Sequence, residues 1–297
     1  MKISHASFAG VSPGIRAMLW SALAFSIMSA LVKVAGDRLP SVQIVMVRGV
    51  VTLVLSLWAV ERAGLSPWGN DRKGLLLRGL LGSAGLHCYF FAVTRLPLAD
   101  ATVIQLTNPL LVALGAAFFL RESLRRVDLV AIVLGLLGVV LVSRPTFLFG
   151  GAERALDPLG LAVAIAGAIF SAGVYIVVRR LRATEHPLVV VLQFPLLTVP
   201  LTLPFAVAQW IWPTPLEWLV MLGVGVFTQI GQVKMTQALH LEPAARATAV
   251  SYVQILFAIG FGLALFAEVP TPWMLGGALA IAAGTAIVVR SRAPATD

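Results

Sequence analysis

The sequence predicts an all-α integral membrane protein in which ten transmembrane helices form two inverted five-helix repeats. Of its 297 residues, 59% are hydrophobic and only 12% are charged, and the mean hydropathy is +0.94. These values lie far outside the range of soluble domains. In addition, a shift of 146 residues superimposes residues 79–144 on residues 225–290 without a gap, with 13 of 66 positions identical. Duplicated sets of apolar helices are typical of transporters.

Ten apolar stretches are long enough to span a bilayer, since a helix needs about 20 mainly apolar residues to cross roughly 30 Å of hydrocarbon. Short breaks that combine charge with a helix-starting proline separate them, as in Arg95-Leu96-Pro97 and Glu242-Pro243. Such short breaks make neighbouring helices antiparallel. We expect the helices at residues 14–35, 40–60, 74–94, 98–120, 126–143, 157–180, 187–208, 215–240, 243–267 and 271–290.

The two repeats divide the chain into residues 1–144 and residues 145–297. Each repeat has an odd number of helices, so the second enters the membrane from the opposite side and is inverted relative to the first. Inverted repeats place a binding cavity at their interface near the midplane, and exchange of the two halves' conformations provides alternating access. Because one chain holds both halves, a monomer is sufficient.

The net charge of +9 reflects membrane topology rather than nucleic-acid binding. With the N-terminus in the cytoplasm, 15 Lys and Arg residues fall on the cytoplasmic side, and only Arg38, Arg95, Arg144 and Arg154 fall on the other side. We expect the cytoplasmic arginines, among them Arg78, Arg179 and Arg246, to be surface cations that anchor the helices at the membrane interface. This bias follows the positive-inside rule and predicts that both termini are cytoplasmic. No basic stripe with interleaved aromatic residues remains, so we expect no nucleic-acid partner.

All 13 acidic residues lie at or beyond the ends of the expected helices, including Glu122 and its repeat counterpart Glu268. A buried carboxylate is a common proton- or sodium-coupling group, and it is kept at membrane depth only for function. The sequence therefore favours facilitated transport. A proton-coupled exporter stays open as an alternative, with His87 as the other obvious titrating group.

Asn108 is the strongest candidate for substrate binding. Pro109 follows it and has no N–H to donate to the Gln105 carbonyl, so a backbone acceptor and a side-chain amide become available together at mid-membrane. Such a pair suits polar substrate groups. A kink satisfied by a neighbouring helix is the alternative interpretation.

The second repeat has Gln254 at the position of Asn108, but Ile255 replaces the proline. We therefore expect a kink in only one of the two related helices and an imperfectly symmetric cavity. Tyr252 lies two residues before Gln254 on a different part of the helix surface. We expect at most one of these two side chains to face the cavity.

Five further polar residues are candidates for substrate binding, each with a structural alternative. Gln232 lies on the polar face of the eighth helix, which should avoid lipid. Arg48 is eight residues into its helix, where its guanidinium could bind a carboxylate or hold helix-end carbonyls. Lys234 could contact substrate or extend to the interface. Tyr175 and His87 could line the cavity or pack within the bundle.

Two segments resemble the EamA repeats of the drug/metabolite transporter superfamily. The first is LPLADATVIQLTNPLLVALGAAFFLRESL at residues 96–124, and the second is PAARATAVSYVQILFAIGFGLALFAE at residues 243–268. Within the superfamily the chain is most similar to bacterial ten-helix exporters of the YddG group. The resemblance implies a multi-pass protein of the bacterial inner (plasma) membrane that exports amino acids, aromatic ones included, or similar metabolites without ATP. It also implies that the fifth and tenth helices are peripheral.

Two other classes of protein are alternatives to a transporter. The sequence has no zinc-protease, nucleophile-elbow or phosphate-loop motif, so we expect no enzyme, no catalytic residue, no metal and no cofactor. A non-transporting membrane receptor or scaffold stays open, because sequence does not reveal whether the two halves move. Within transport, the alternative cargo is a drug or a nucleotide-type metabolite.

Overall fold

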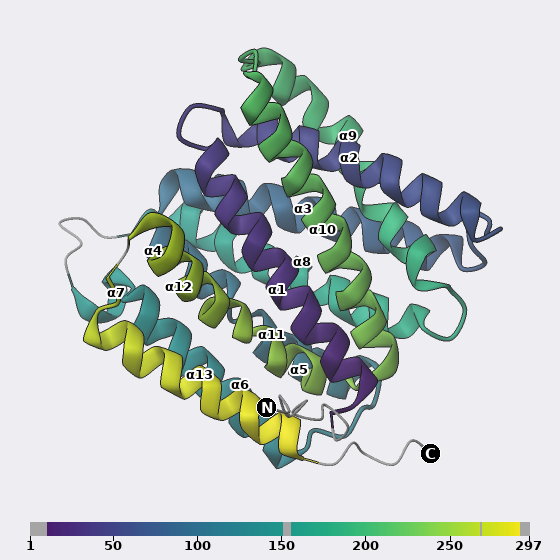
Figure 1. Cartoon of the computed structure of the whole chain (residues 1–297). Helices are drawn as coiled ribbons and strands as arrows, with labels where there is room; N and C mark the ends of the chain where they lie inside the picture. The colour runs from purple at the N-terminus through teal and green to yellow at the C-terminus, as the bar shows by residue number, and fades with distance from the viewer. Residues whose placement is uncertain (1–10, 151–155, 268, 292–297) are drawn as a thin grey trace, which may run out of the picture.

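A computed structural model describes residues 11–150, 156–267 and 269–291 and is helical in architecture (Figure 1). Ten spans are long and apolar enough to cross a membrane, as predicted, and each falls within a few residues of its expected bounds. Two charged residues named in the sequence analysis, Arg154 and Glu268, lie outside the described residues. The helices are α1 (Pro13–Ala35), α2 (Ser41–Arg62), α3 (Arg72–Arg95), α4 (Leu98–Gln105), α5 (Asn108–Phe119), α6 (Arg126–Ser143), α7 (Thr146–Phe149), α8 (Pro158–Leu181), α9 (Pro187–Ala208), α10 (Pro215–Leu241), α11 (Ala244–Ser251), α12 (Val253–Phe266) and α13 (Pro272–Arg290).

The helices begin at capping residues that satisfy their first backbone N–H groups. The Asp71 carboxylate accepts from the Gly74 N–H at 2.9 Å, and α10 begins with a reciprocal capping box between Thr214 and Glu217. Pro occupies the first turn of six helices, where its missing N–H costs nothing. The breaks between spans are therefore encoded locally.

The two repeats form the same helix–helix interface twice. In one, α1 lies along α10, and a Cβ on Gly231 would lie 2.8 Å from the Phe25 ring. In the other, α3 lies along α8, and a Cβ on Gly85 would lie 2.9 Å from the Ser171 hydroxyl. Each pair of residues is the other pair shifted by 146, so the two halves meet through equivalent surfaces. The fold is the predicted pair of inverted repeats.

Helices α6 and α13 form a separate layer at the edge of the bundle (Figure 1). They approach closely because a Cβ on Gly277 would lie 2.6 Å from the Gly138 carbonyl oxygen, and one on Gly138 would lie 2.6 Å from the Gly277 carbonyl oxygen. Small residues allow this backbone contact without a hydrophobic driving force. The layer agrees with the supporting role predicted for the fifth and tenth spans.

The fourth and ninth spans are both interrupted, which corrects the expectation of a one-sided kink. The fourth divides into α4 and α5 at Leu106 and Thr107, and the ninth divides into α11 and α12 at Tyr252. Pro109 explains the first break. In the second, the Thr248 and Ser251 hydroxyls donate back to carbonyls of their own helix, a pattern that bends helices without proline.

Helix α1 begins and α13 ends at one end of the bundle, as an even number of spans requires (Figure 1). We call this the terminal end and the opposite one the distal end.

Candidate functional site: a central cavity at two helix breaks

A cavity of about 400 Å³ lies between the two repeats, at the breaks in the fourth and ninth spans. Most of its lining consists of repeat mates, residues 146 positions apart. This symmetry is stronger than the sequence analysis expected, because the missing proline does not abolish the second break. The seven pairs are Ser29/Tyr175, Tyr89/Met235, Thr102/Thr248, Gln105/Ser251, Leu106/Tyr252, Asn108/Gln254 and Pro109/Ile255.

The cavity opens toward the distal end and is closed at the terminal end. Its lining near the distal end includes Ser29 and Ala258, which are exposed. Near the terminal end, Met18 and Thr248 are 2% and 1% exposed. The packing of the helix halves also indicates an opening at the distal end. At the terminal end α5 packs against α11, whereas α4 and α12 share no packed interface over the described part of the chain. The structure is therefore open to one side only.

Asn108 carries an unused hydrogen-bond acceptor at the cavity wall. Its Oδ1 is buried and has no hydrogen-bond partner among the described residues. A buried polar atom without a partner costs free energy unless a ligand or water satisfies it. Asn108 is therefore placed to bind a polar group that enters the cavity.

Gln254 lies at the equivalent position of the second repeat and also lines the cavity. The Ser26 hydroxyl lies 2.8 Å from the Gln254 backbone carbonyl and 2.8 Å from the Ala22 carbonyl, and shares its one proton between them. Ser26 thus fixes α12 against α1 at the level of the break. The backbone is held by this contact.

Tyr252 lines the cavity as well, so the expectation that only one of Tyr252 and Gln254 would do so is wrong. Its hydroxyl donates to the Leu106 carbonyl at 2.9 Å, across the boundary between the repeats. The break itself explains the difference. The Ile255 N–H donates to the Tyr252 carbonyl three residues back, which tightens the helix locally. The tighter turn changes the direction in which the side chains around the break point.

Tyr175, the fourth predicted residue in the lining, faces the cavity from α8. Arg78 of α3 is close enough to Tyr175 for the two side chains to interact electrostatically. Arg78 is almost fully buried, donates to the Gln232 Oε1 at 3.2 Å and stacks on Phe194. It was counted above as a surface cation, so this placement is a correction.

The other four predicted site residues lie outside the cavity lining. His87 contacts the Ser83 carbonyl of its own helix at 2.7 Å, and Gln232 is engaged by Arg78. Arg48 has a buried Nε without a hydrogen-bond partner among the described residues. Lys234 faces a groove on the outside of the bundle. Sequence gives the depth of these residues, but helix packing decides which way each side chain points.

Seven polar lining residues were missed as candidates, and four of them form two repeat pairs: Thr102 with Thr248, and Gln105 with Ser251. Gln105 donates from Nε2 to the Ser171 hydroxyl at 2.9 Å, which links α4 to α8. The repeat offset carried the signal for these two pairs. Gln105 and Ser251 lie one helical turn before the Asn108 and Gln254 positions.

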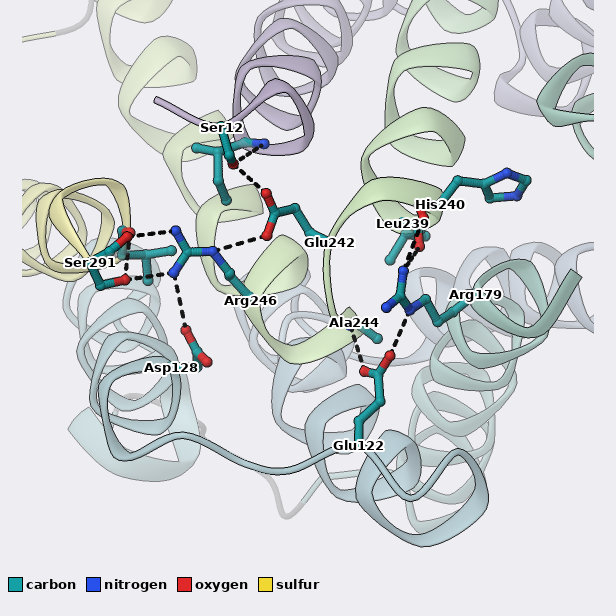
Figure 2. Close-up of polar contacts among 12 residues, drawn as sticks. Ser12, Glu122, Asp128, Arg179, Leu239, His240, Glu242, Ala244, Arg246 and Ser291 are labelled. Carbon is teal, nitrogen blue, oxygen red and sulfur yellow. Dashed lines mark hydrogen bonds and ion pairs between the residues drawn. The ribbon is translucent and has the colours of Figure 1, made fainter. Parts of the chain in front are cut away.

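The terminal end is closed by a charged network, defined here as Ser12, Glu122, Asp128, Arg179, Glu242, Arg246 and Ser291 (Figure 2). In its first cluster, Arg179 of α8 donates to Glu122 at 2.6 Å and to the Leu239 carbonyl at 2.9 Å. Glu122 also accepts from the Ala244 N–H at 2.8 Å. These contacts join the α5–α6 connection to α8, α10 and α11, below the cavity.

The second cluster of this network centres on Arg246, which is 1% exposed (Figure 2). It forms an ion pair with Glu242 at 3.1 Å and donates to the Ser291 hydroxyl at 2.6 Å. Ser12 donates to the other Glu242 oxygen. Arg246 and Arg179 were both expected to be interfacial anchors, but they are buried because acidic side chains and carbonyls surround them.

The distal end has an equivalent contact with the opposite charge. Asp100, the repeat mate of Arg246, is 0% exposed and accepts from the Thr146 N–H at 2.6 Å and hydroxyl at 2.5 Å. Both contacts therefore tie the start of a broken span to the end of the span that follows. Asp100 does this at the distal end and Arg246 at the terminal end.

Comparison with known proteins decides the family. The model of the EamA-like transporter family matches residues 12–144 and 158–290, two segments related by the same offset of 146. The chain belongs to the EamA-like transporter family. It is a multi-pass membrane transporter with a small-molecule substrate, and it is not an enzyme.

Individual relatives of this EamA-like transporter cover most of its length. It is 31% identical over 277 residues to "Pseudopaline exporter CntI" of Pseudomonas aeruginosa, covering 93% of each chain. It is 29% identical to "Solute carrier family 35 member G1" of Homo sapiens, covering 91% of this chain and 77% of that one. A protein of known crystal structure has a TM-score of 0.79 at 21% identity, covering 92% of this chain and 95% of the other, which supports the fold.

Proposed function

We propose that this EamA-like transporter exports small polar metabolites without net charge, foremost amino acids including aromatic ones, by facilitated alternating access across the bacterial inner membrane. The observation that carries the proposal is the cavity lining. It presents amides, hydroxyls and phenols, and none of the lining residues described carries a carboxylate or a cationic group. Its volume of about 400 Å³ falls within the range of small-molecule sites.

A zwitterionic amino acid fits the electrostatics of this cavity. Neutral hydrogen-bonding groups at the two breaks can bind both an ammonium and a carboxylate group without a fixed charge of either sign. Arg78, which interacts electrostatically with Tyr175, adds a positive potential that favours the carboxylate. The rings of Tyr89, Tyr175 and Phe25 offer apolar surface to an aromatic side chain.

The arrangement of the helix halves supports alternating access. In this conformation the cavity is open distally, and α5 packs on α11 beneath it. The inverted repeat supplies the other conformation, in which α4 and α12 would close and α5 and α11 would part. Opening the terminal end then requires the Glu122–Arg179 contact to break.

The orientation proposed is that both termini lie in the cytoplasm, because the positive-inside bias favours it. The cavity described then faces the external side. A relative named as an exporter supports outward transport as the physiological direction. One chain contains both repeats, so we propose that the monomer is the working unit.

Counterflow in proteoliposomes tests this proposal. Vesicles preloaded with a mixed amino-acid pool are exposed to single labelled amino acids, with and without an imposed pH gradient, and protein-free vesicles serve as the control. Saturable exchange that is indifferent to pH supports the proposal. Exchange that requires the gradient favours a proton-coupled exporter instead. Absence of exchange for every amino acid would contradict the proposal that amino acids are the cargo, and the assay would then be repeated with drugs and nucleotides. A folded protein that transports none of these compounds would favour a receptor or scaffold.

A further inference from the structure

A second polar site lies on the outside of the bundle, away from the transport cavity. A groove of about 500 Å³ runs between the first turns of α1 and the last turns of α10, next to Pro187 at the start of α9. Its polar lining residues are Arg16, Lys234, Gln237 and His240, and no acidic residue lines it within the described chain. None of these four lines the central cavity. The groove therefore concentrates positive charge at one point on the lipid-facing surface.

The cationic groups of this groove are not neutralised by the protein. Arg16 is exposed and has no hydrogen-bond or ion-pair partner in the part of the chain that is described. Within the same residues, the Lys234 Nζ donates only to the neutral Gln237 Oε1, at 3.2 Å. The His240 Nε2, which is buried and has no hydrogen-bond partner among the described residues, adds an uncharged polar group beside these two cations. The two cations favour an anion that supplies several acceptor oxygens.

An apolar groove of about 390 Å³ adjoins the charged one and shares Arg16 and Trp20 with it. Its other lining residues are Leu19, Leu23 and Phe257. Leu23 is ten residues into α1, about 15 Å along the helix at 1.5 Å per residue, so the apolar groove extends toward the hydrocarbon centre. Trp20 is 60% exposed at the junction, in the interfacial position that tryptophan prefers.

We propose that the two grooves together bind one anionic phospholipid. The headgroup phosphate contacts Arg16 and Lys234, and one acyl chain lies along Leu19, Leu23 and Phe257. The order of polarity carries the assignment: cations stand at the helix ends and apolar side chains follow toward the membrane centre, as in a phospholipid. A free phosphate or a soluble anion would leave the apolar groove unused. Because the lipid would bridge α1, α10 and α12, it would also stabilise the contacts that close the terminal end.

Native mass spectrometry of the full-length protein tests this binding without any transport step, so it is independent of the proposed cargo. The purified protein is titrated with dioleoyl phosphatidylglycerol and, in parallel, with dioleoyl phosphatidylcholine. We expect one phosphatidylglycerol to be retained preferentially. A basic residue near the membrane surface contributes about five-fold in affinity for anionic lipid, so Arg16→Gln and Lys234→Gln should each weaken retention by about that factor.

Arg126→Gln is the matched control, because Arg126 is an exposed arginine that begins α6 at the same end of the bundle. It should bind as the unmodified protein does. Leu23→Ala tests the acyl-chain groove with all charges intact and should also weaken retention. If Lys234→Gln fails to fold, Arg16→Gln and Leu23→Ala still decide the matter.

Three outcomes would overturn the proposal. Equal retention of phosphatidylcholine would indicate unspecific annular lipid. Equal loss in Arg126→Gln would indicate a general charge effect. Competition by glycerophosphoglycerol, the headgroup without chains, at the same concentration as the lipid would identify a free-phosphate site instead.

Discussion

The Tyr252 hydroxyl donates a hydrogen bond of 2.9 Å to the carbonyl of Leu106, and these two residues occupy the same position in the two repeats. The bond therefore crosses the pseudo-two-fold axis at the point where both spans are broken. It satisfies a carbonyl that the interrupted fourth helix cannot use fully. Tyr252 thus joins the two halves of the transporter beside the cavity, and only one half has a tyrosine at this position.

Tyr252→Phe should destabilise the protein by about 1–2 kcal/mol, because it leaves the Leu106 carbonyl with a buried, unpaired acceptor. The melting temperature in detergent measures this. Tyr89→Phe is the matched control for stability, since its hydroxyl has no hydrogen-bond partner in the described chain although it also lines the cavity. Equal melting temperatures for both variants would show that the bond contributes nothing.

Asn108→Ala should weaken substrate binding while leaving the fold intact, because its Oδ1 has no protein partner to lose. A lost hydrogen bond to substrate corresponds to about 0.5–1.5 kcal/mol, so we expect KM for counterflow to rise up to about ten-fold. Gln254→Ala should act in the same direction. Gln209→Ala, which removes an exposed amide at the end of α9, is the control. A parallel fall in melting temperature in Asn108→Ala would mean that the residue holds the kink rather than the cargo.

Glu122→Gln should open the terminal end, because it removes the ion pair that joins the α5–α6 connection to Arg179. Loss of one partner of a buried pair typically costs about 3–5 kcal/mol, and the cost is smaller here because Glu122 is only half-buried. The readout is a reporter cysteine at Thr248, in a Cys88→Ser background, labelled by an impermeant maleimide. Labelling from the terminal side should become several-fold faster.

Two further variants separate opening from unfolding in that experiment. The double variant Glu122→Gln/Arg179→Gln removes the uncompensated cation and should recover part of the lost stability. Arg180→Gln removes an exposed neighbouring charge and should leave labelling unchanged. If Glu122→Gln labels at the rate of the parent, the pair does not control access.

Gly277→Ala and Gly276→Ala should have opposite effects although the residues are adjacent. A Cβ at position 277 would lie 2.6 Å from the Gly138 carbonyl oxygen, and backbone cannot move away easily. We expect destabilisation of about 1–3 kcal/mol. A Cβ at position 276 meets no atom within 4 Å, so that variant should be neutral or gain up to about 1 kcal/mol of helix propensity. Similar melting temperatures would contradict the close packing of α6 and α13.

The sequence was sufficient for the ten spans, because hydropathy, proline and charge mark each boundary locally. It also located the first break, since Pro109 removes a backbone donor. The second break has no such local mark. It depends on hydroxyl groups of α11 bonding to their own backbone and on the contact from Tyr252 to Leu106, which requires both repeats to be folded.

The sequence gives the depth of a candidate site residue but not the direction of its side chain. Asn108, Gln254, Tyr252 and Tyr175 line the cavity, whereas Lys234 points outward at a similar depth. Substrate binding by these residues stays a prediction. The prediction that arginines at helix ends lie at the membrane interface was also wrong for the buried ones. An arginine at a helix end resembles an interfacial anchor in sequence, and only its contacts with Glu242, Asp128 and Ser291 in the folded protein make Arg246 an internal partner.

The paired cavity lining has a kinetic consequence. Of the seven related pairs, only Thr102 and Thr248 carry the same side chain, so each face of the carrier offers its cargo a different set of contacts. The half-saturation constants measured from the two sides should therefore differ. For a facilitator at equilibrium, however, the ratio of maximal rate to half-saturation constant must be equal in both directions, so tighter capture on one face entails proportionally slower passage from it.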